Sequence, residues 1–193
     1  MAKPKILAFA GSLRKDSYNK KLVKVAVEGA KLAGADVTLI DLKDFPLPVF
    51  DQDLEKEEGM PENGKKLKKL FLEHQGLLIS SPEYNSSISG VLKNTIDWLS
   101  RVESKDEPPL ACFAGKVAAL MSASPGGLGG LRGLVTLRSI LGNIKVLVLP
   151  DQIAVAKAHE AFNPDGTLKD AKQQASVSAV VASLVKILSK LNS

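Results

Sequence analysis

The sequence predicts an α/β protein in which five parallel strands form one doubly wound sheet with helices on both faces. Apolar runs that look like buried strands recur at wide spacing, and helical patterns lie between them. The expected strands are residues 5–10, 37–40, 76–80, 116–121 and 144–149. Strands that alternate with helices pair in parallel, so five such units indicate a flavodoxin-like or Rossmann-like sheet.

Apolar stripes and turn residues predict where the helices begin and end. The first begins near Tyr18 and ends at Gly34, because a glycine commonly follows the last helical turn. The other helices are expected at residues 63–74, 89–101, 128–142 and about 168–191. The proline-rich and acidic stretch at 45–63 is expected to be a long connection that covers the site or contacts a partner subunit.

Composition narrows the class of protein. The 193 residues, 45% hydrophobic and 24% charged, suit a single domain over 1–193. The lone Cys112 excludes an intrachain disulfide, and we find neither a signal peptide nor an apolar run long enough to span a bilayer, so the cytoplasm is expected. The net charge of +5 comes from scattered lysines with few aromatics, which favours small anionic substrates over nucleic acid.

A polar turn follows the first strand and leads into the first helix. Ser12, Arg14, Ser17 and Asn19 surround the expected helix N-terminus, where unpaired N–H groups and the helix dipole favour an anion. The hydroxyl, amide and guanidinium groups can add hydrogen bonds to phosphate oxygens. The turn therefore predicts a phosphate site.

Other interpretations of this turn stay open. Ser17 alone can act as a helix N-cap, and Gly11 can simply end the strand. Asp16 stands where a P-loop needs its second glycine, and Leu13 and Asp16 replace two glycines of a dinucleotide fingerprint. A mononucleotide is therefore the better expectation.

A second polar loop, residues 81–90, follows the third strand. It is made rigid by Pro82 and offers backbone N–H groups and side-chain amides that can meet the edge of a flat heteroaromatic ring. The alternative is a capped helix start with Tyr84 packed on the surface.

Together these motifs resemble one family. The residues that carry the resemblance are Gly11-Ser12-Leu13-Arg14, Ser17, Asn19, Pro82-Glu83-Tyr84-Asn85, Leu92-Lys93-Asn94 and Asp97-Trp98. They are similar to the NADPH-dependent FMN reductases, a flavodoxin-like group that includes quinone, azo-dye and chromate reductases. The resemblance extends to about residue 160.

The resemblance implies a set of FMN contacts. The phosphate site is implied at Ser12, Arg14, Ser17 and Asn19, and the isoalloxazine and ribityl contacts at Pro82, Glu83, Tyr84, Asn85 and Ser86. A third loop, with Ser122, Ser124, Gly126 and Gly127, is implied to close over the other side of the flavin. Glu83 and Arg101 resemble residues that pair across an interface in a homodimer or homotetramer. An internal surface ion pair is the alternative for both.

The implied activity is hydride transfer from NADPH or NADH through FMN to quinones, azo compounds, chromate or free flavin. We expect no catalytic side chain and no metal, because His74, His159 and Cys112 have no partner pattern and a cofactor can carry the chemistry. Two alternatives remain: a flavodoxin-type FMN electron carrier that does not use NAD(P)H, and a nucleotide-binding module without turnover.

Overall fold

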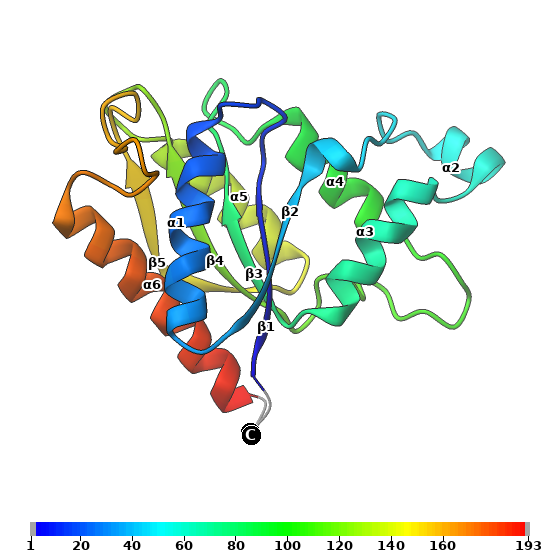
Figure 1. Cartoon of the computed structure of the whole chain (residues 1–193). Coiled ribbons are helices and arrows are strands. Elements are labelled where there is room, and N and C mark those ends of the chain that lie inside the picture. The colour runs from blue at the N-terminus through cyan, green and yellow to red at the C-terminus, as the bar shows by residue number, and fades with distance from the viewer. Residues whose placement is uncertain (1–2, 192–193) are drawn as a thin grey trace.

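The sheet is parallel and has the strand order β2-β1-β3-β4-β5 (Figure 1). A computed structural model describes residues 3–191 of the chain. The strands are β1 (Lys5–Ala10), β2 (Asp36–Asp41), β3 (Gly76–Ser80), β4 (Val117–Ala123) and β5 (Leu147–Val155). This order is that of flavodoxin-like sheets, which confirms the predicted fold class.

Two helical layers cover the sheet, and alternate strand residues face each layer. Ile6, Ala8 and Ala10 pack under α1 (Tyr18–Leu32) and α6 (Ala171–Leu191). Leu7 and Phe9 face the opposite layer of α3 (Glu62–Glu73), α4 (Gly90–Leu99) and α5 (Leu131–Asn143). Because both faces are covered, β3 and β4 are continuously buried apolar runs.

The fifth strand lies later in the chain than residues 144–149. Ile144 follows the last turn of α5, and Lys145 has a positive φ of 68°, so the start of the apolar run is a turn. The strand then continues through Pro150 to Val155, with a register shift against β4 between Ala118 and Leu120. Proline is tolerated there because β5 is an edge strand.

The connection at 45–63 contains a helix that the sequence did not reveal. Helix α2 (Gln52–Glu58) has no buried residue, so no apolar stripe marks it, and a short 3₁₀ turn, η1 (Leu42–Asp44), precedes the connection. Helix α4 holds the connection in place, because Asn94 Nδ2 and Trp98 Nε1 both donate to Pro48 O at 2.8 Å. These two motif residues therefore have a structural role.

The length and composition of helix α6 contradict the expectation that no apolar run is long enough to span a bilayer. Within residues 3–191 it is the one helix long and apolar enough, by length and composition, to cross a bilayer, so the statement that no run reaches this length is wrong. Its buried residues, however, are Val177, Val180, Val181, Leu184, Val185 and Leu188. They pack in the core beside α1, as the apolar side of a core helix does.

Candidate functional site

A cavity of about 240 Å³ lies where three loops meet at the carboxyl ends of β1, β3 and β4. This is the edge of a doubly wound sheet at which ligands bind. The predicted site residues that line it are Ser12, Arg14, Ser17, Asn19, Pro82, Glu83, Tyr84 and Ser124. Asn85, Ser86, Ser122, Gly126, Gly127 and Arg101 are not in its lining.

Hydroxyl groups and a helix N-terminus form one side of the cavity. Ser17 is the N-cap of α1, and its Oγ accepts a hydrogen bond from Asn19 N at 3.2 Å. Ser12 Oγ accepts from Arg14 N at 3.4 Å. Both serines are buried, and as acceptors they keep their O–H groups available to donate. The capping interpretation of Ser17 is thus correct and compatible with a phosphate site.

Asn19 braces the site from inside the protein. Its Oδ1 accepts hydrogen bonds from Ser80 Oγ at 2.9 Å and from Ala123 N at 3.0 Å, and its Nδ2 donates to Ala123 O at 2.9 Å. These bonds tie α1 to the ends of β3 and β4. Only one of the two Nδ2 protons is used by Ala123, so the other can serve a ligand. No sequence pattern indicated this brace, because its partners lie 61 and 104 residues away.

Arg14 lies at the exposed rim of the cavity. Its Nη2 donates to Asp16 O at 2.9 Å, and its guanidinium carbon is 5.7 Å from the centroid of the Tyr18 ring. Tyr18 itself lines the cavity, although no sequence motif marks it as a site residue. Its ring lies parallel to that of Phe162, with centroids 6.5 Å apart.

The second loop contains a tight two-residue hairpin. Tyr84 and Ser87 exchange two backbone hydrogen bonds of 3.0 Å, and Asn85 and Ser86 between them have φ values of 50° and 64°. Two successive positive φ values define a type I′ turn, which is strained for a residue such as serine. Asn85 and Ser86 are exposed, so the turn presents its backbone to solvent beside the cavity.

Glu83 joins this hairpin to α5. Its Oε1 accepts from Arg132 Nε at 2.9 Å, and its Oε2 accepts from Gly133 N at 3.1 Å. Burial alone would raise the pKa of Glu83, but the bonds from Gly133 and Arg132 favour the carboxylate, so its pKa is lowered. A Cβ on Gly133 would lie 3.2 Å from both Glu83 Cβ and Ser87 O, so glycine permits this close packing.

The third loop turns through glycines into α5. Gly129 and Gly130 have φ values of +61° and +89°, and a Cβ on Gly130 would overlap Ser122 Oγ. Ser122 is fully buried. Within residues 3–191, its Oγ is the single buried side-chain oxygen or nitrogen atom that has no hydrogen-bond partner. Ser122 therefore packs beneath the start of α5, whereas Ser124 faces the cavity and its Oγ accepts from Gly126 N at 3.3 Å.

Arg101 lies two residues after the end of α4, and its Nε contacts Glu55 Oε1 of α2 at 2.7 Å. Glu83 pairs with Arg132 in the same way, within one chain. Both residues therefore form internal ion pairs in this structure, which was the alternative to pairing across an interface.

His74 and Cys112 lie outside the cavity, and both are buried. His74 is buried, with Nδ1 2.6 Å from Leu70 O and Nε2 2.7 Å from Thr38 Oγ1. Burial raises the pKa of the Cys112 thiol to about 11. Over residues 3–191, no group of three or more His, Cys, Asp or Glu side chains is placed to hold a metal ion.

The donor set of the cavity fits a mononucleotide such as FMN. One end offers the N-terminus of α1 with two buried hydroxyl groups for a phosphate, and the other end offers the polar hairpin. The volume is below the roughly 300–1,000 Å³ of enclosed small-molecule sites, so a ligand of this size would project from the cavity with one side exposed.

Comparison with known proteins identifies the family to which this chain is similar. The model of the family described as NADPH-dependent FMN reductase matches residues 4–160. An NAD(P)H-dependent FMN reductase of Pseudomonas aeruginosa is 36% identical over 87% of this chain and 86% of its own length. An NAD(P)H:quinone oxidoreductase of Solanum tuberosum is 35% identical over 97% of this chain and 94% of its own.

A solved structure agrees with these sequence matches. FerB from Paracoccus denitrificans, a flavoenzyme NAD(P)H:(acceptor) oxidoreductase, has a TM-score of 0.81 and 29% identity, covering 97% of this chain and 98% of its own. The matched region, residues 4–160, includes all three loops of the cavity. The chain belongs to the NADPH-dependent FMN reductase family.

Proposed function

We propose that the chain binds FMN in the cavity between its three loops and transfers reducing equivalents from NAD(P)H to quinone-type acceptors. The observation that carries the proposal is the convergence of the α1 N-terminus, the strained hairpin and the Ser124 loop on one cavity. The family supports FMN-dependent NAD(P)H oxidoreduction, and the compared relatives are named as reductases rather than as electron carriers.

The first turn would hold the phosphate. The free N–H groups at the start of α1 and the O–H groups of Ser12 and Ser17 can donate to phosphate oxygens, and Arg14 can reach over them from the rim. Asn19 holds these donors in place through its bonds to Ser80 and Ala123. The phosphate site is therefore preorganised before a ligand arrives.

The hairpin and the Ser124 loop would hold the ring. Backbone N–H groups at Asn85 and Ser86 can donate to the ring edge, and Glu83 keeps the hairpin fixed against α5. FMN held between these two loops would supply the hydride-transfer chemistry that links NAD(P)H to an acceptor. Tyr84, half exposed at the cavity, offers a flat surface beside which a quinone can pack.

Three further features belong to the proposal. Residues 1–193 act as a single FMN-binding domain in the cytoplasm, as the composition suggests. A homodimer or homotetramer would bury the exposed Leu131 and Val135 of α5, next to the Glu83 hairpin. Pairing of Glu83 or Arg101 across such an interface would require each to exchange its present partner, Arg132 or Glu55.

A steady-state acceptor panel tests this function. FMN-loaded protein is assayed with NADPH and with NADH against benzoquinone, an azo dye, chromate and free FMN. We expect rapid oxidation of NAD(P)H with benzoquinone and slower rates with the other acceptors. Protein that holds FMN but leaves both nicotinamides unoxidised would instead be a carrier, and protein that binds no FMN would refute the proposal.

A further inference from the structure

A second, larger groove adjoins the proposed FMN cavity. It has a volume of about 640 Å³ and lies between α1 and the segment that precedes α6. Its principal lining residues are Lys21, Lys24, Phe162, Asn163 and Lys169. The volume is within the roughly 300–1,000 Å³ that small-molecule sites occupy.

A closed hairpin positions the aromatic side of this groove. Asn163 N donates to Thr167 O at 2.8 Å and Lys169 N donates to Ala161 O at 2.9 Å, which fixes Phe162 at the base of the hairpin. The Phe162 ring is parallel to that of Tyr18, and Tyr18 lines the FMN cavity. The two aromatic rings therefore connect the groove with the cavity.

The groove carries an excess of available positive charge. Among residues 3–191, the ammonium groups of Lys21, Lys24 and Lys169 form no ion pair. Two carboxylates also line it. Glu28 pairs with Lys31 at 2.9 Å, and Asp165 accepts hydrogen bonds from Thr167, which lower its pKa and keep it ionised. The three lysines outnumber these carboxylates, and Lys21 Nζ lies 6.0 Å from the Phe162 ring centroid.

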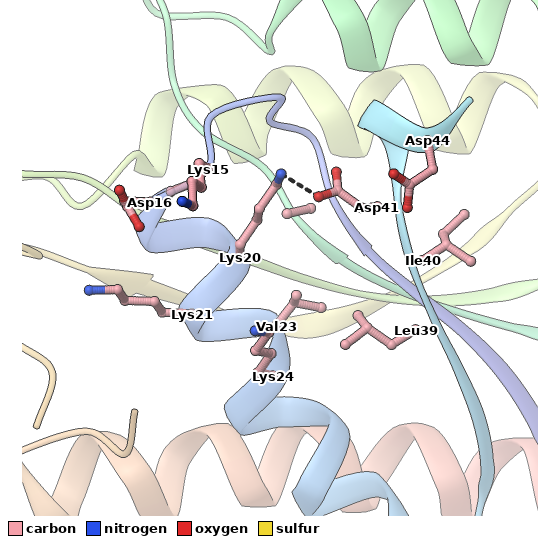
Figure 2. A pocket seen from close by; sticks show the side chains of 12 residues that line it. Lys15, Asp16, Lys20, Lys21, Val23, Lys24, Leu39, Ile40, Asp41 and Asp44 are labelled. Atoms are coloured by element: carbon pink, nitrogen blue, oxygen red, sulfur yellow. Dashed lines mark hydrogen bonds and ion pairs between the residues drawn. The ribbon is translucent and has the colours of Figure 1, made fainter. Parts of the chain in front are cut away.

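The groove on the other side of α1 has no aromatic residue in its lining. It has a volume of about 460 Å³ and runs along β2 (Figure 2). Beside the Lys20–Asp41 ion pair, its charged lining residues are Lys15, Lys21, Lys24, Asp16 and Asp44. The charge balance of the two grooves is therefore similar, and the ring of Phe162 is what distinguishes the larger one. In Figure 2 the Lys21 side chain extends away from Asp41 and Asp44, and Lys21 and Lys24 line both grooves.

We infer that the groove between α1 and the 162–169 hairpin binds the adenosine half of NADPH. The purine ring packs against Phe162, and Lys24 and Lys169 attract the 2′-phosphate, which NADH lacks. This inference rests on the proposed function, since it assigns a place to the reductant of that reaction. Contacts with the 2′-phosphate would make the chain bind NADPH more tightly than NADH.

The test uses a double variant that combines Lys24→Ala and Lys169→Ala. The control variant is Lys186→Ala, which removes an exposed lysine of α6 outside the groove. Calorimetry on the FMN-loaded protein measures binding of adenosine 2′,5′-bisphosphate. Steady-state assays measure KM for NADPH and for NADH. Loss of two charge-assisted contacts should raise the dissociation constant and the NADPH KM about tenfold or more. For the double lysine variant, the KM for NADH and the kcat should stay within about twofold of the wild-type values. For Lys186→Ala, all of these values should stay within about twofold of wild type.

Phe162→Leu supplies a second readout. Loss of ring packing should weaken NADPH and NADH alike, because both carry adenine. Equal effects of the double lysine variant on both nicotinamides, or no effect on either, would overturn the inference. Wild-type protein that binds the bisphosphate but oxidises no nicotinamide would refute the proposed function while retaining the groove as a site.

Discussion

The carboxylate of Glu83 accepts a hydrogen bond of 3.1 Å from the backbone N–H of Gly133, in the first turn of α5. An unpaired N–H group at a helix N-terminus favours a negative charge, so the contact stabilises both partners. Thr136 of the same helix donates to Ser86 O at 3.4 Å. Helix α5 is thus the support on which the proposed flavin hairpin rests.

Replacing Glu83 should loosen this support. Glu83→Gln removes the charge but keeps the length, so we expect the free energy of unfolding to fall by about 1–2 kcal/mol, mainly through the bond to Gly133. The exposed Arg132 should contribute little, because surface ion pairs are weak. Urea titration of FMN-free protein measures the loss. Arg132→Ala serves as the control and should cost less than Glu83→Gln.

The same variant gives a pH signature. Because the folded pKa of Glu83 lies below its ordinary value of 4.5, its stabilising contribution is present above that value and is lost as the pH falls through the lowered pKa. The difference in stability between wild type and Glu83→Gln should therefore be constant from neutral pH down to about 5. It should shrink at lower pH. A difference that grows on acidification would contradict this assignment of the charge.

Two glycines of the third loop should respond differently to substitution. Gly130→Ala places a methyl group against Ser122 Oγ at a φ of +89°, so we expect a loss of about 2 kcal/mol or more in unfolding free energy. Gly127→Ala has no atom within 4 Å of the new methyl group and should change stability by less than about 0.5 kcal/mol. Chemical denaturation of the two variants side by side measures the contrast. Equal losses would show that the loop backbone differs from this description.

Arg14 should matter for cofactor affinity rather than for stability. Its side chain is exposed, and among residues 3–191 its contacts are a hydrogen bond to Asp16 O and the Tyr18 ring, so Arg14→Ala should leave the melting temperature nearly unchanged. The FMN affinity should fall by about 2–3 kcal/mol if a charge-assisted bond to phosphate is lost. Fluorescence titration of FMN measures it, and riboflavin provides the control because it lacks the phosphate. Unchanged FMN affinity would place the phosphate elsewhere.

Cys112 should be unreactive in the folded protein. The thiol is fully buried and its pKa is about 11, so little thiolate is accessible at neutral pH. A chromogenic disulfide reagent should react slowly with native protein and rapidly in denaturant. Fast labelling of the native state at one thiol per chain would show that the segment around Cys112 opens readily.

The elements that periodicity specifies were predictable from the sequence. Strands β1 and β3 match residues 5–10 and 76–80, because uninterrupted apolar runs bounded by turn residues leave little choice. Helix α2 was missed because nothing in it is buried, and β5 was displaced because the apolar run begins in the turn after α5. The prediction failed where a helix has no buried face and where apolar residues form a turn instead of a strand.

The site was predictable in outline but not in the direction of its side chains. Converging loops follow from the sheet order, and residues such as Ser12, Ser17 and Tyr84 line the resulting cavity. That they bind a cofactor stays a prediction. The inward brace of Asn19 and the contact of Glu83 with α5 depend on partners far away in the sequence. Only the folded chain reveals such contacts.

The measurement that tests the central claim most directly is an FMN titration under anaerobic conditions, followed by addition of NADPH. The account predicts that the protein binds one FMN per chain, that Arg14→Ala binds it more weakly, and that one equivalent of NADPH bleaches the visible absorbance of the bound flavin. Protein that binds no FMN, or whose bound FMN keeps its absorbance with excess NADPH, would contradict the account.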